Sequence, residues 1–279
     1  MARDRLPIVL VVAGLLLAYV PTYHDFLAGP FAGYAQGHEL LVLAVVAFLF
    51  FRRRNELSAL PDAPRHAWAI ALLSFGVLLY AFGRSQLFLR LELLSQVFVL
   101  AAVLVGAKGF AALRICWFPI VFLLFVVPLP HALVLALTAP LKAAASAITT
   151  SLLAAAGYPI GRSGVVITIG QYELLVATAC AGLQTMFTLE ALSLLYVNLK
   201  GHASWVRNAL LAALAVPVAF VANVVRVMAL SLVTYHFGDA VGRGLAHGFA
   251  GLGLFAVALL LIMALDRLLG WLLPARLAR

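Results

Sequence analysis

The sequence has few charged residues and almost no cysteine, and these two shortages exclude whole classes of protein. Charged residues make up only 10% of the 279 residues, whereas hydrophobic residues make up 65%. A soluble domain of this length cannot bury so much apolar sequence, so repeated apolar runs of about twenty residues indicate an integral membrane protein. Two cysteines are too few for a disulfide framework. Walker, zinc-binding and Gly-x-Ser-x-Gly motifs are absent.

Acidic residues are scarcer than basic ones, with 10 against 19 and a formal net charge of +9. The basic residues lie in short gaps between apolar runs, where they set membrane orientation rather than bind nucleic acid. With a cytoplasmic N-terminus and with His131–Tyr158 not crossing, 13 of the 19 Lys and Arg residues face the cytoplasm and 6 face outward. A crossing at His131–Tyr158 would invert every later segment, so the count favours the non-crossing arrangement.

The predicted fold class is an all-α integral membrane protein forming a single multi-pass domain over residues 1–279. The apolar runs predict about eight crossing helices, at 7–23, 37–51, 67–83, 91–107, 113–130, 176–199, 206–228 and 248–268. Pro140 and Lys142 interrupt His131–Tyr158, which therefore predicts interfacial or re-entrant helices. Val165–Ile169 alternates, Gly170-Gln171 can turn, and Tyr172–Val176 can return, which predicts a small outer β-hairpin.

The hairpin leads directly into Cys180, which opens a long apolar run. Gly182 leaves room for another backbone to approach closely, and Gln184 lies one helical turn after the cysteine. A free cysteine in such a run is commonly a small buried hydrophobic residue. Cys116, in contrast, is predicted near the cytoplasmic end of the fifth helix, as a packing residue that cannot bridge to Cys180.

Two further polar residues are expected near the level of Cys180. Cys180 lies 20 residues from Lys200, Arg226 lies 19 from Arg207, and His247 lies 20 from Arg267. Each distance corresponds to roughly 30 Å of helix, about one hydrocarbon thickness from a basic cytoplasmic marker. Arg226 in apolar sequence is a functional candidate, with Asn223 one turn earlier to hold its guanidinium. The alternatives are a snorkelling arginine and a histidine satisfied by the backbone at a helix end.

A cysteine, a histidine and an arginine that converge are the parts of a thiol acyl-transfer site. The thiolate is the nucleophile, and a nearby cation lowers its pKa. The histidine can accept the thiol proton and later protonate the leaving amine. The arginine can stabilise the oxyanion of the tetrahedral intermediate. His131, which follows Pro128-Leu129-Pro130, is the main rival to His247 as the base, and His236 is a weaker rival.

Several motifs together resemble the exosortase/archaeosortase family, and most of all the bacterial exosortases. They are VPLPHALVLALTAPLK (127–142), YPIGRSGVVITIGQYELLVATACAGLQ (158–184), NVVR (223–226) and the late His247. The resemblance implies a multi-pass cysteine transpeptidase with Cys180 as nucleophile, Arg226 as the transition-state residue and His247 as acid/base. The catalytic part is then roughly 128–268. The family usually has serine after the cysteine, whereas this chain has Ala181.

The resemblance also implies partners and a location. The substrates would be secreted proteins with a C-terminal Pro-Glu-Pro-like motif, an apolar helix and a basic tail, processed at the periplasmic face of the bacterial inner membrane. The acceptor stays open between water and an amine on lipid or polysaccharide. Arg162 is the first candidate to meet the acidic motif, ahead of Arg84, Arg90 and Arg243, because it precedes the hairpin. No metal, cofactor or nucleic acid is expected.

Two other functions remain open from the residues themselves. One is a transporter or polysaccharide-assembly subunit in which Arg226 binds an anionic substrate and Cys180 is incidental. The other is a catalytically idle scaffold. Only the transpeptidase requires the thiol of Cys180.

Overall fold

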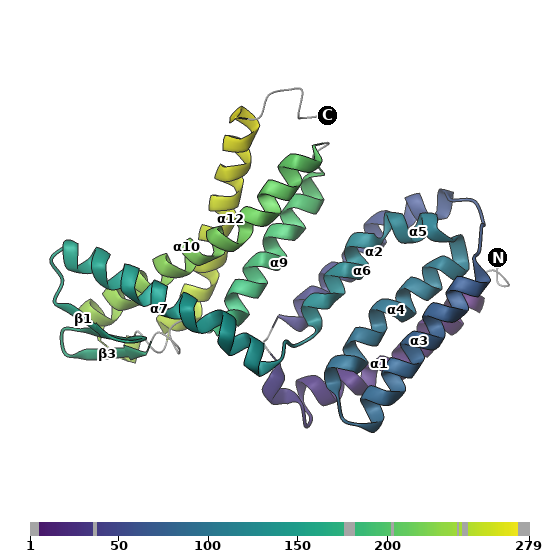
Figure 1. The fold of residues 1–279 in the computed structure, drawn as a ribbon, viewed down its shortest axis with the longest axis horizontal. Helices are drawn as coiled ribbons and strands as arrows, with labels where there is room; N and C mark the ends of the chain where they lie inside the picture. The colour runs from purple at the N-terminus through teal and green to yellow at the C-terminus, as the bar shows by residue number, and fades with distance from the viewer. Residues whose placement is uncertain are drawn as a thin grey trace. The chain divides into compact units, whose positions relative to one another are not determined.

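The computed structural model describes residues 6–35, 38–175, 182–201, 204–238, 240–241 and 245–272. The chain falls into two compact units, Met1–Leu129 and Pro130–Arg279. Helices dominate both, and the one sheet described lies in the second unit (Figure 1). The predicted class, helical with a small antiparallel sheet, is confirmed. The predicted catalytic part, 128–268, falls almost wholly in the second unit.

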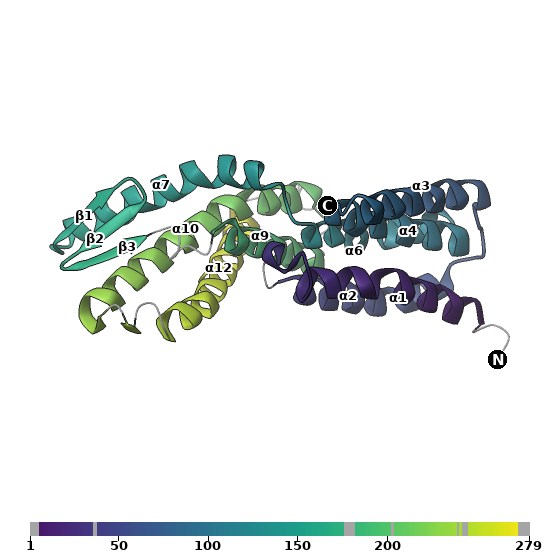
Figure 2. The ribbon, with the colours of Figure 1, turned by 90° about the horizontal axis from the view of Figure 1, so that it is seen from below.

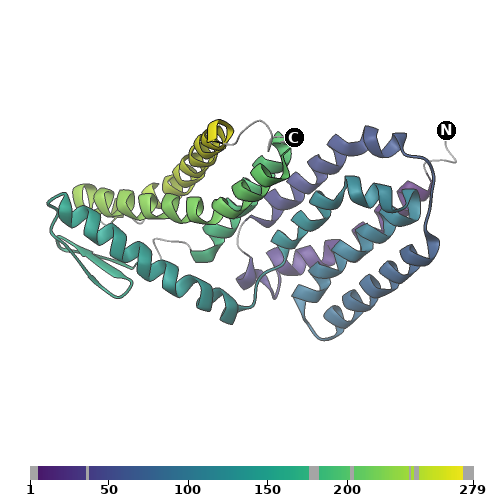
Figure 3. The ribbon, with the colours of Figure 1, turned by 45° about the horizontal axis from the view of Figure 1, so that its top comes forward.

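The first unit is built from helices throughout its described residues. They are α1 (Leu6–Leu27), the 3₁₀ helix η1 (Ala32–Tyr34), α2 (Glu39–Ala59), α3 (His66–Ser85), α4 (Leu89–Lys108), α5 (Phe110–Ile115), α6 (Trp117–Phe122) and the 3₁₀ helix η2 (Leu123–Val126). The helices α1 to α4 lie where the apolar runs at 7–23, 37–51, 67–83 and 91–107 predicted them. They form the bluer half of the chain in Figure 3.

The predicted helix at 113–130 is wrong as a single element. It is divided at Cys116 into α5 and α6, and it passes into η2 before ending at Val126. Pro119 explains the division, because its ring meets the carbonyl of the residue four positions earlier, Ile115, where α5 ends. Cys116 at the break is fully buried, as expected of a packing residue.

The hairpin of α3 and α4 is tightly packed and carries a buried polar network. A Cβ on Gly83 would lie 2.8 Å from the backbone nitrogen of Glu92, so only glycine permits this approach. Glu92 is fully buried, and its Oε2 accepts from Thr22 of α1 at 2.8 Å and from Arg84 of α3 at 3.4 Å. Arg84 also donates to Asp25 of α1 at 2.7 Å. The network therefore joins α1 to the α3–α4 hairpin.

Within its described residues, the second unit has long helices and a three-stranded sheet. They are α7 (His131–Ala155), the strands β1 (Ile160–Ser163), β2 (Val166–Ile169) and β3 (Tyr172–Leu175), then α9 (Gly182–Lys200), α10 (Trp205–Phe237) and α12 (Leu245–Leu272). Figure 2 shows the sheet beside α7 and α10. The predicted helices at 176–199, 206–228 and 248–268 correspond to α9, α10 and α12, although α10 continues nine residues further than predicted.

The predicted interruption of His131–Tyr158 is wrong. The structure has one continuous helix, α7, over 25 residues with Pro140 inside it. The residue four positions before Pro140 is Ala136, and such prolines are tolerated in membrane helices because neighbouring groups satisfy the freed backbone.

The predicted hairpin is confirmed, and it is part of a larger sheet. The strands β2 and β3 pair antiparallel with Ile169 opposite Tyr172, so Gly170 and Gln171 form a two-residue turn. Gly170 has a φ of +56°, which this turn requires of its first residue. The strand β1 adds to β2 on its other side, giving the order β1-β2-β3.

Candidate membrane crossings can be identified by the length and hydropathy of the described helices. Five helices among the described residues are long and apolar enough to cross: Val9–Leu27, His66–Ser85, Leu89–Lys108, Ala132–Ala155 and Trp205–Phe237. The predicted count of eight is not confirmed. The five include α7, the segment expected to lie at the interface.

Candidate active site

An ion-pair cluster ties together one end of the three helices that carry the predicted catalytic region. Asp266 of α12 is 4% exposed and accepts from the Nε of Arg207 of α10 at 2.8 Å. Its second carboxylate oxygen accepts from the hydroxyl of Tyr196 of α9 at 2.9 Å. Arg207 also donates through Nη2 to the backbone carbonyl of Asp266 at 2.7 Å. We call these three residues the Asp266 cluster; it brings the end of α9, the start of α10 and the end of α12 to one level.

Small residues bring the same three helices together further along. Leu189 of α9 is buried against Ala219 and Ala222 of α10 and Ala258 of α12, with Val257 and Leu261 packed around them. Alanine at such contacts lets helix backbones approach closely. The helix α10 therefore runs antiparallel to both α9 and α12, and lies beside them in Figure 1.

Arg226 lies on α10, one turn beyond this small-residue contact. It is only 5% exposed, and Asn223, one turn earlier, is also 5% exposed. Neither side chain is without a partner. A snorkelling arginine would extend its guanidinium outward, whereas Arg226 is enclosed by protein. Its burial in the bundle fits the functional interpretation better.

His247 and the residues that follow Cys180 are placed through their backbones. His247 is the third residue of α12, and Gly182 is the first residue of α9 with Gln184 two positions on. The structure does not describe the side chains of His247 and Gln184, and Cys180 and Ala181 lie outside the described residues. In sequence, Cys180 precedes the start of α9 by two residues.

The three helices use different numbers of residues between the Asp266 cluster and the small-residue contact. From the Asp266 cluster to the small-residue contact, α9 advances 7 residues to Leu189 and α12 spans 8 back to Ala258. The helix α10 needs 15 residues from Arg207 to Ala222. Between the same two contacts, α10 therefore uses more residues than α9 or α12 does.

The sheet packs against the second half of α10. Ile167 of β2 is fully buried against Val227, the residue after Arg226, with Ile160, Val165 and Leu174 around the pair. At the far end of the sheet, a Cβ on Gly170 would lie 3.1 Å from the ring of Tyr235. The strand that precedes the Cys180 segment is thus fixed to the helix that carries Arg226.

The remaining predicted residues lie apart from this packing. Arg162 is exposed on β1, the edge strand, opposite Ile167 of β2. His131 is the first residue of α7, and the structure does not describe its side chain. His236, near the end of α10, is exposed, and its Nε2 lies 3.5 Å from the hydroxyl of Tyr158. Among the described residues, no three His, Cys, Asp or Glu side chains cluster as metal ligands would.

Sequence reasoning missed the Asp266 cluster. From the charge count alone, Arg207 is only an orientation signal, and that count gives Asp266 no role. An acidic residue inside the last apolar run, next to Arg267, is a signal that such a pair exists.

The sequence was compared with models of known protein families to find the family of this chain. The profile of the transmembrane exosortase family matches residues 32–264, most of the chain. The chain belongs to the transmembrane exosortase family. A search of curated proteins and a search of solved structures each found no match. The matched range of this exosortase covers α9, α10 and α12 as far as residue 264, and with them Cys180, Arg226 and His247.

Proposed function

We propose that this exosortase is a membrane cysteine transpeptidase with Cys180 as its nucleophile. The observation that carries the proposal is the burial of Arg226 on α10. The helix α10 itself packs against α9, which starts two residues after Cys180, and against α12, which begins near His247. In a member of the exosortase family, a permanently charged guanidinium inside a helical bundle is suited to stabilise negative charge that develops during acyl transfer.

The reaction would proceed in two acyl transfers. His247 accepts the proton of the Cys180 thiol, and the thiolate attacks the carbonyl carbon of the scissile peptide bond. Arg226 donates hydrogen bonds to the oxyanion of the tetrahedral intermediate. The intermediate collapses to a thioester, and His247 gives its proton to the departing amine. Water or an amine acceptor then attacks the thioester, His247 takes the acceptor's proton, and the thiol of Cys180 is restored.

The substrates we propose are secreted proteins that end in a Pro-Glu-Pro-type motif, an apolar helix and a basic tail. The location we propose is the inner membrane, with the active site toward the periplasm. An apolar helix holds such a substrate in the bilayer, where a multi-pass enzyme can meet it. The acceptor would be water, or an amine on lipid or polysaccharide.

The test is Cys180→Ala, scored by processing of a secreted reporter that carries this C-terminal signal. We expect no processed product, and we expect hydroxylamine to release processed reporter from the wild-type enzyme as a thioester would. Cys116→Ala is the matched control, because Cys116 belongs to the other unit and is fully buried. Normal processing by Cys180→Ala would refute the proposal and favour a transporter in which Arg226 binds an anion.

A further inference from the structure

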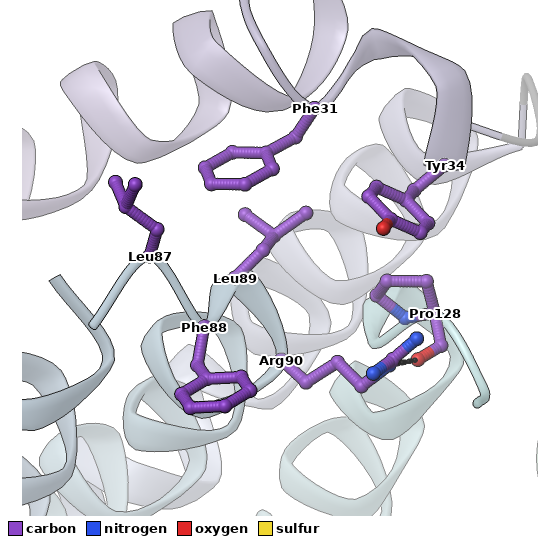
Figure 4. A pocket seen from close by; sticks show the side chains of 7 residues that line it. All are labelled: Phe31, Tyr34, Leu87, Phe88, Leu89, Arg90 and Pro128. Carbon is purple, nitrogen blue, oxygen red and sulfur yellow. Dashed lines mark hydrogen bonds between the residues drawn. The ribbon is translucent and has the colours of Figure 1, made fainter.

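The first unit contains a pocket lined by rings and a single cation. It lies where η1, the turn between α3 and α4, and the end of the unit meet, and its volume is about 160 Å³. Figure 4 shows the residues that line it: Phe31, Tyr34, Leu87, Phe88, Leu89, Arg90 and Pro128. Pro128 precedes the start of the second unit by two residues.

Arg90 lies at the edge of this pocket, and its guanidinium is held there through Nε. Its Nε donates to the carbonyl of Pro128 at 3.0 Å, and its guanidinium carbon lies 5.8 Å from the ring centroid of Tyr34. In the part of the chain that the structure describes, no carboxylate pairs with Arg90. A guanidinium fixed through Nε presents its two terminal nitrogens to a carboxylate in bidentate geometry.

The other arginines expected on the same side are less suited to bind an acidic ligand. Arg84 already donates to Asp25 and Glu92. Arg162 is exposed on an edge strand, and it lines no pocket that the structure describes. Arg243 lies outside the described residues. Arg90 alone among the described three combines an available fork with apolar walls.

The turn beside the pocket holds an apolar side chain in a strained position. Leu87 has a φ of +56°, the single positive value among the described residues other than glycine, and it is 70% exposed. This conformation is unfavourable for a branched side chain and persists where the surroundings impose it. Here the backbone nitrogen of Phe88 donates to the carbonyl of Gly83 at 2.8 Å and fixes the turn. The fixed turn places the Leu87 side chain in the lining of the pocket, where Phe31 also lies (Figure 4).

We infer that this pocket binds the acidic sorting motif of the substrate, with the glutamate carboxylate on Arg90 and the flanking proline rings against Phe31, Tyr34 and Phe88. The inference rests on the proposed function. One guanidinium matches the single charge of a carboxylate, and flat aromatic walls match apolar rings on either side of it. Sites for lipid phosphates gather several basic residues, whereas Arg90 is the one basic residue that lines this pocket.

The experiment exchanges charge between enzyme and signal. Wild type, Arg90→Gln and Arg90→Glu are each assayed with reporters that carry Pro-Glu-Pro, Pro-Gln-Pro or Pro-Lys-Pro, in nanodiscs of neutral phosphatidylcholine. Gln retains an N–H for the Pro128 carbonyl but has no charge. With the Pro-Glu-Pro reporter we expect Arg90→Gln to lose about 10- to 100-fold in kcat/KM, mainly through KM, the range of one or two charge-assisted hydrogen bonds. With the Pro-Gln-Pro reporter, the wild type and Arg90→Gln should have the same kcat/KM. The Arg90→Glu enzyme should have its highest kcat/KM with the Pro-Lys-Pro reporter.

The controls separate this inference from the proposed function. Arg114→Glu is the matched control, because Arg114 is exposed and does not line the pocket, and it should process all three reporters as the wild type does. Arg162→Glu is assayed beside it. A charge exchange that follows Arg162 instead of Arg90 would overturn the inference. An equal loss with all three reporters, reversed by adding anionic lipid, would also overturn it and would identify a lipid site. If Arg90→Glu processes Pro-Glu-Pro normally while Cys180→Ala is inactive, the inference fails and the transpeptidase stands. Processing by Cys180→Ala would refute the proposed function itself.

Discussion

Removal of the Asp266 carboxylate should destabilise the second unit far more than removal of an exposed carboxylate elsewhere. The Asp266 side chain is 5% exposed and that of Arg207 is 22% exposed. Breaking a buried pair costs about 3–5 kcal/mol because the remaining charge loses its partner. Arg207 has some access to solvent and keeps its bond to the Asp266 backbone carbonyl. We therefore expect Asp266→Ala to lower the free energy of unfolding by about 2–3 kcal/mol, at the lower end of that range or just below it.

The assay is reversible unfolding in mixed micelles of dodecylmaltoside and sodium dodecyl sulfate, followed by circular dichroism. Asp62→Ala is the control, because Asp62 pairs with Lys108 but is 80% exposed. An exposed pair contributes about 0–1 kcal/mol, so this variant should unfold almost like the wild type.

A double-mutant cycle shows whether the effect belongs to the pair. Arg207→Ala combined with Asp266→Ala should cost less than the two single substitutions added together, because neither charge is then left alone. If Asp266→Ala and Asp62→Ala destabilise equally, or if the cycle shows no coupling, the Asp266 cluster does not hold the three helices together.

Two further predictions concern the proposed catalytic residues. Arg226→Lys keeps the charge but loses the planar fork, so processing should fall at least ~100-fold, the scale of one lost oxyanion donor; the exposed Arg162→Lys should be near normal, and normal turnover by Arg226→Lys would indicate a simple cation. In a Cys116→Ser background, a membrane-impermeant thiol reagent applied to cells with a permeable outer layer should label Cys180. Labelling only after the inner membrane is broken would contradict the periplasmic placement.

The sequence predicted the long, uninterrupted helices well, because their apolar runs and flanking charges are local features. The proline positions were harder. Pro119 divides its helix at Cys116, whereas Pro140 lies inside continuous α7, and the outcome depends on which neighbours satisfy the freed backbone groups. The strand β1 was missed because Ile160-Gly161-Arg162-Ser163 has no alternation of apolar residues; it forms by pairing with β2.

The candidate site was predictable in part. Arg226 was identified because a charge inside apolar sequence is conspicuous, and its burial agrees with that reasoning. The small-residue contact one turn before it was not predictable, since the alanines at 219, 222 and 258 come from two separate helices and meet only in three dimensions. The pocket around Arg90 joins residues from three separate segments, so no spacing along the chain indicates it.

The helix α10 is longer than a membrane crossing requires. Its 33 residues extend over about 50 Å, against roughly 30 Å of hydrocarbon, and a tilt of 40° still leaves about 38 Å along the membrane normal. Trp205, which is 75% exposed, and Arg207 suit the interface at the start of the helix, so the excess lies at the other end, where the sheet packs near Tyr235. If the proposed function holds, this end of α10 would extend beyond the bilayer surface, and the enzyme would favour substrates whose scissile bond lies a fixed number of residues beyond their own apolar helix.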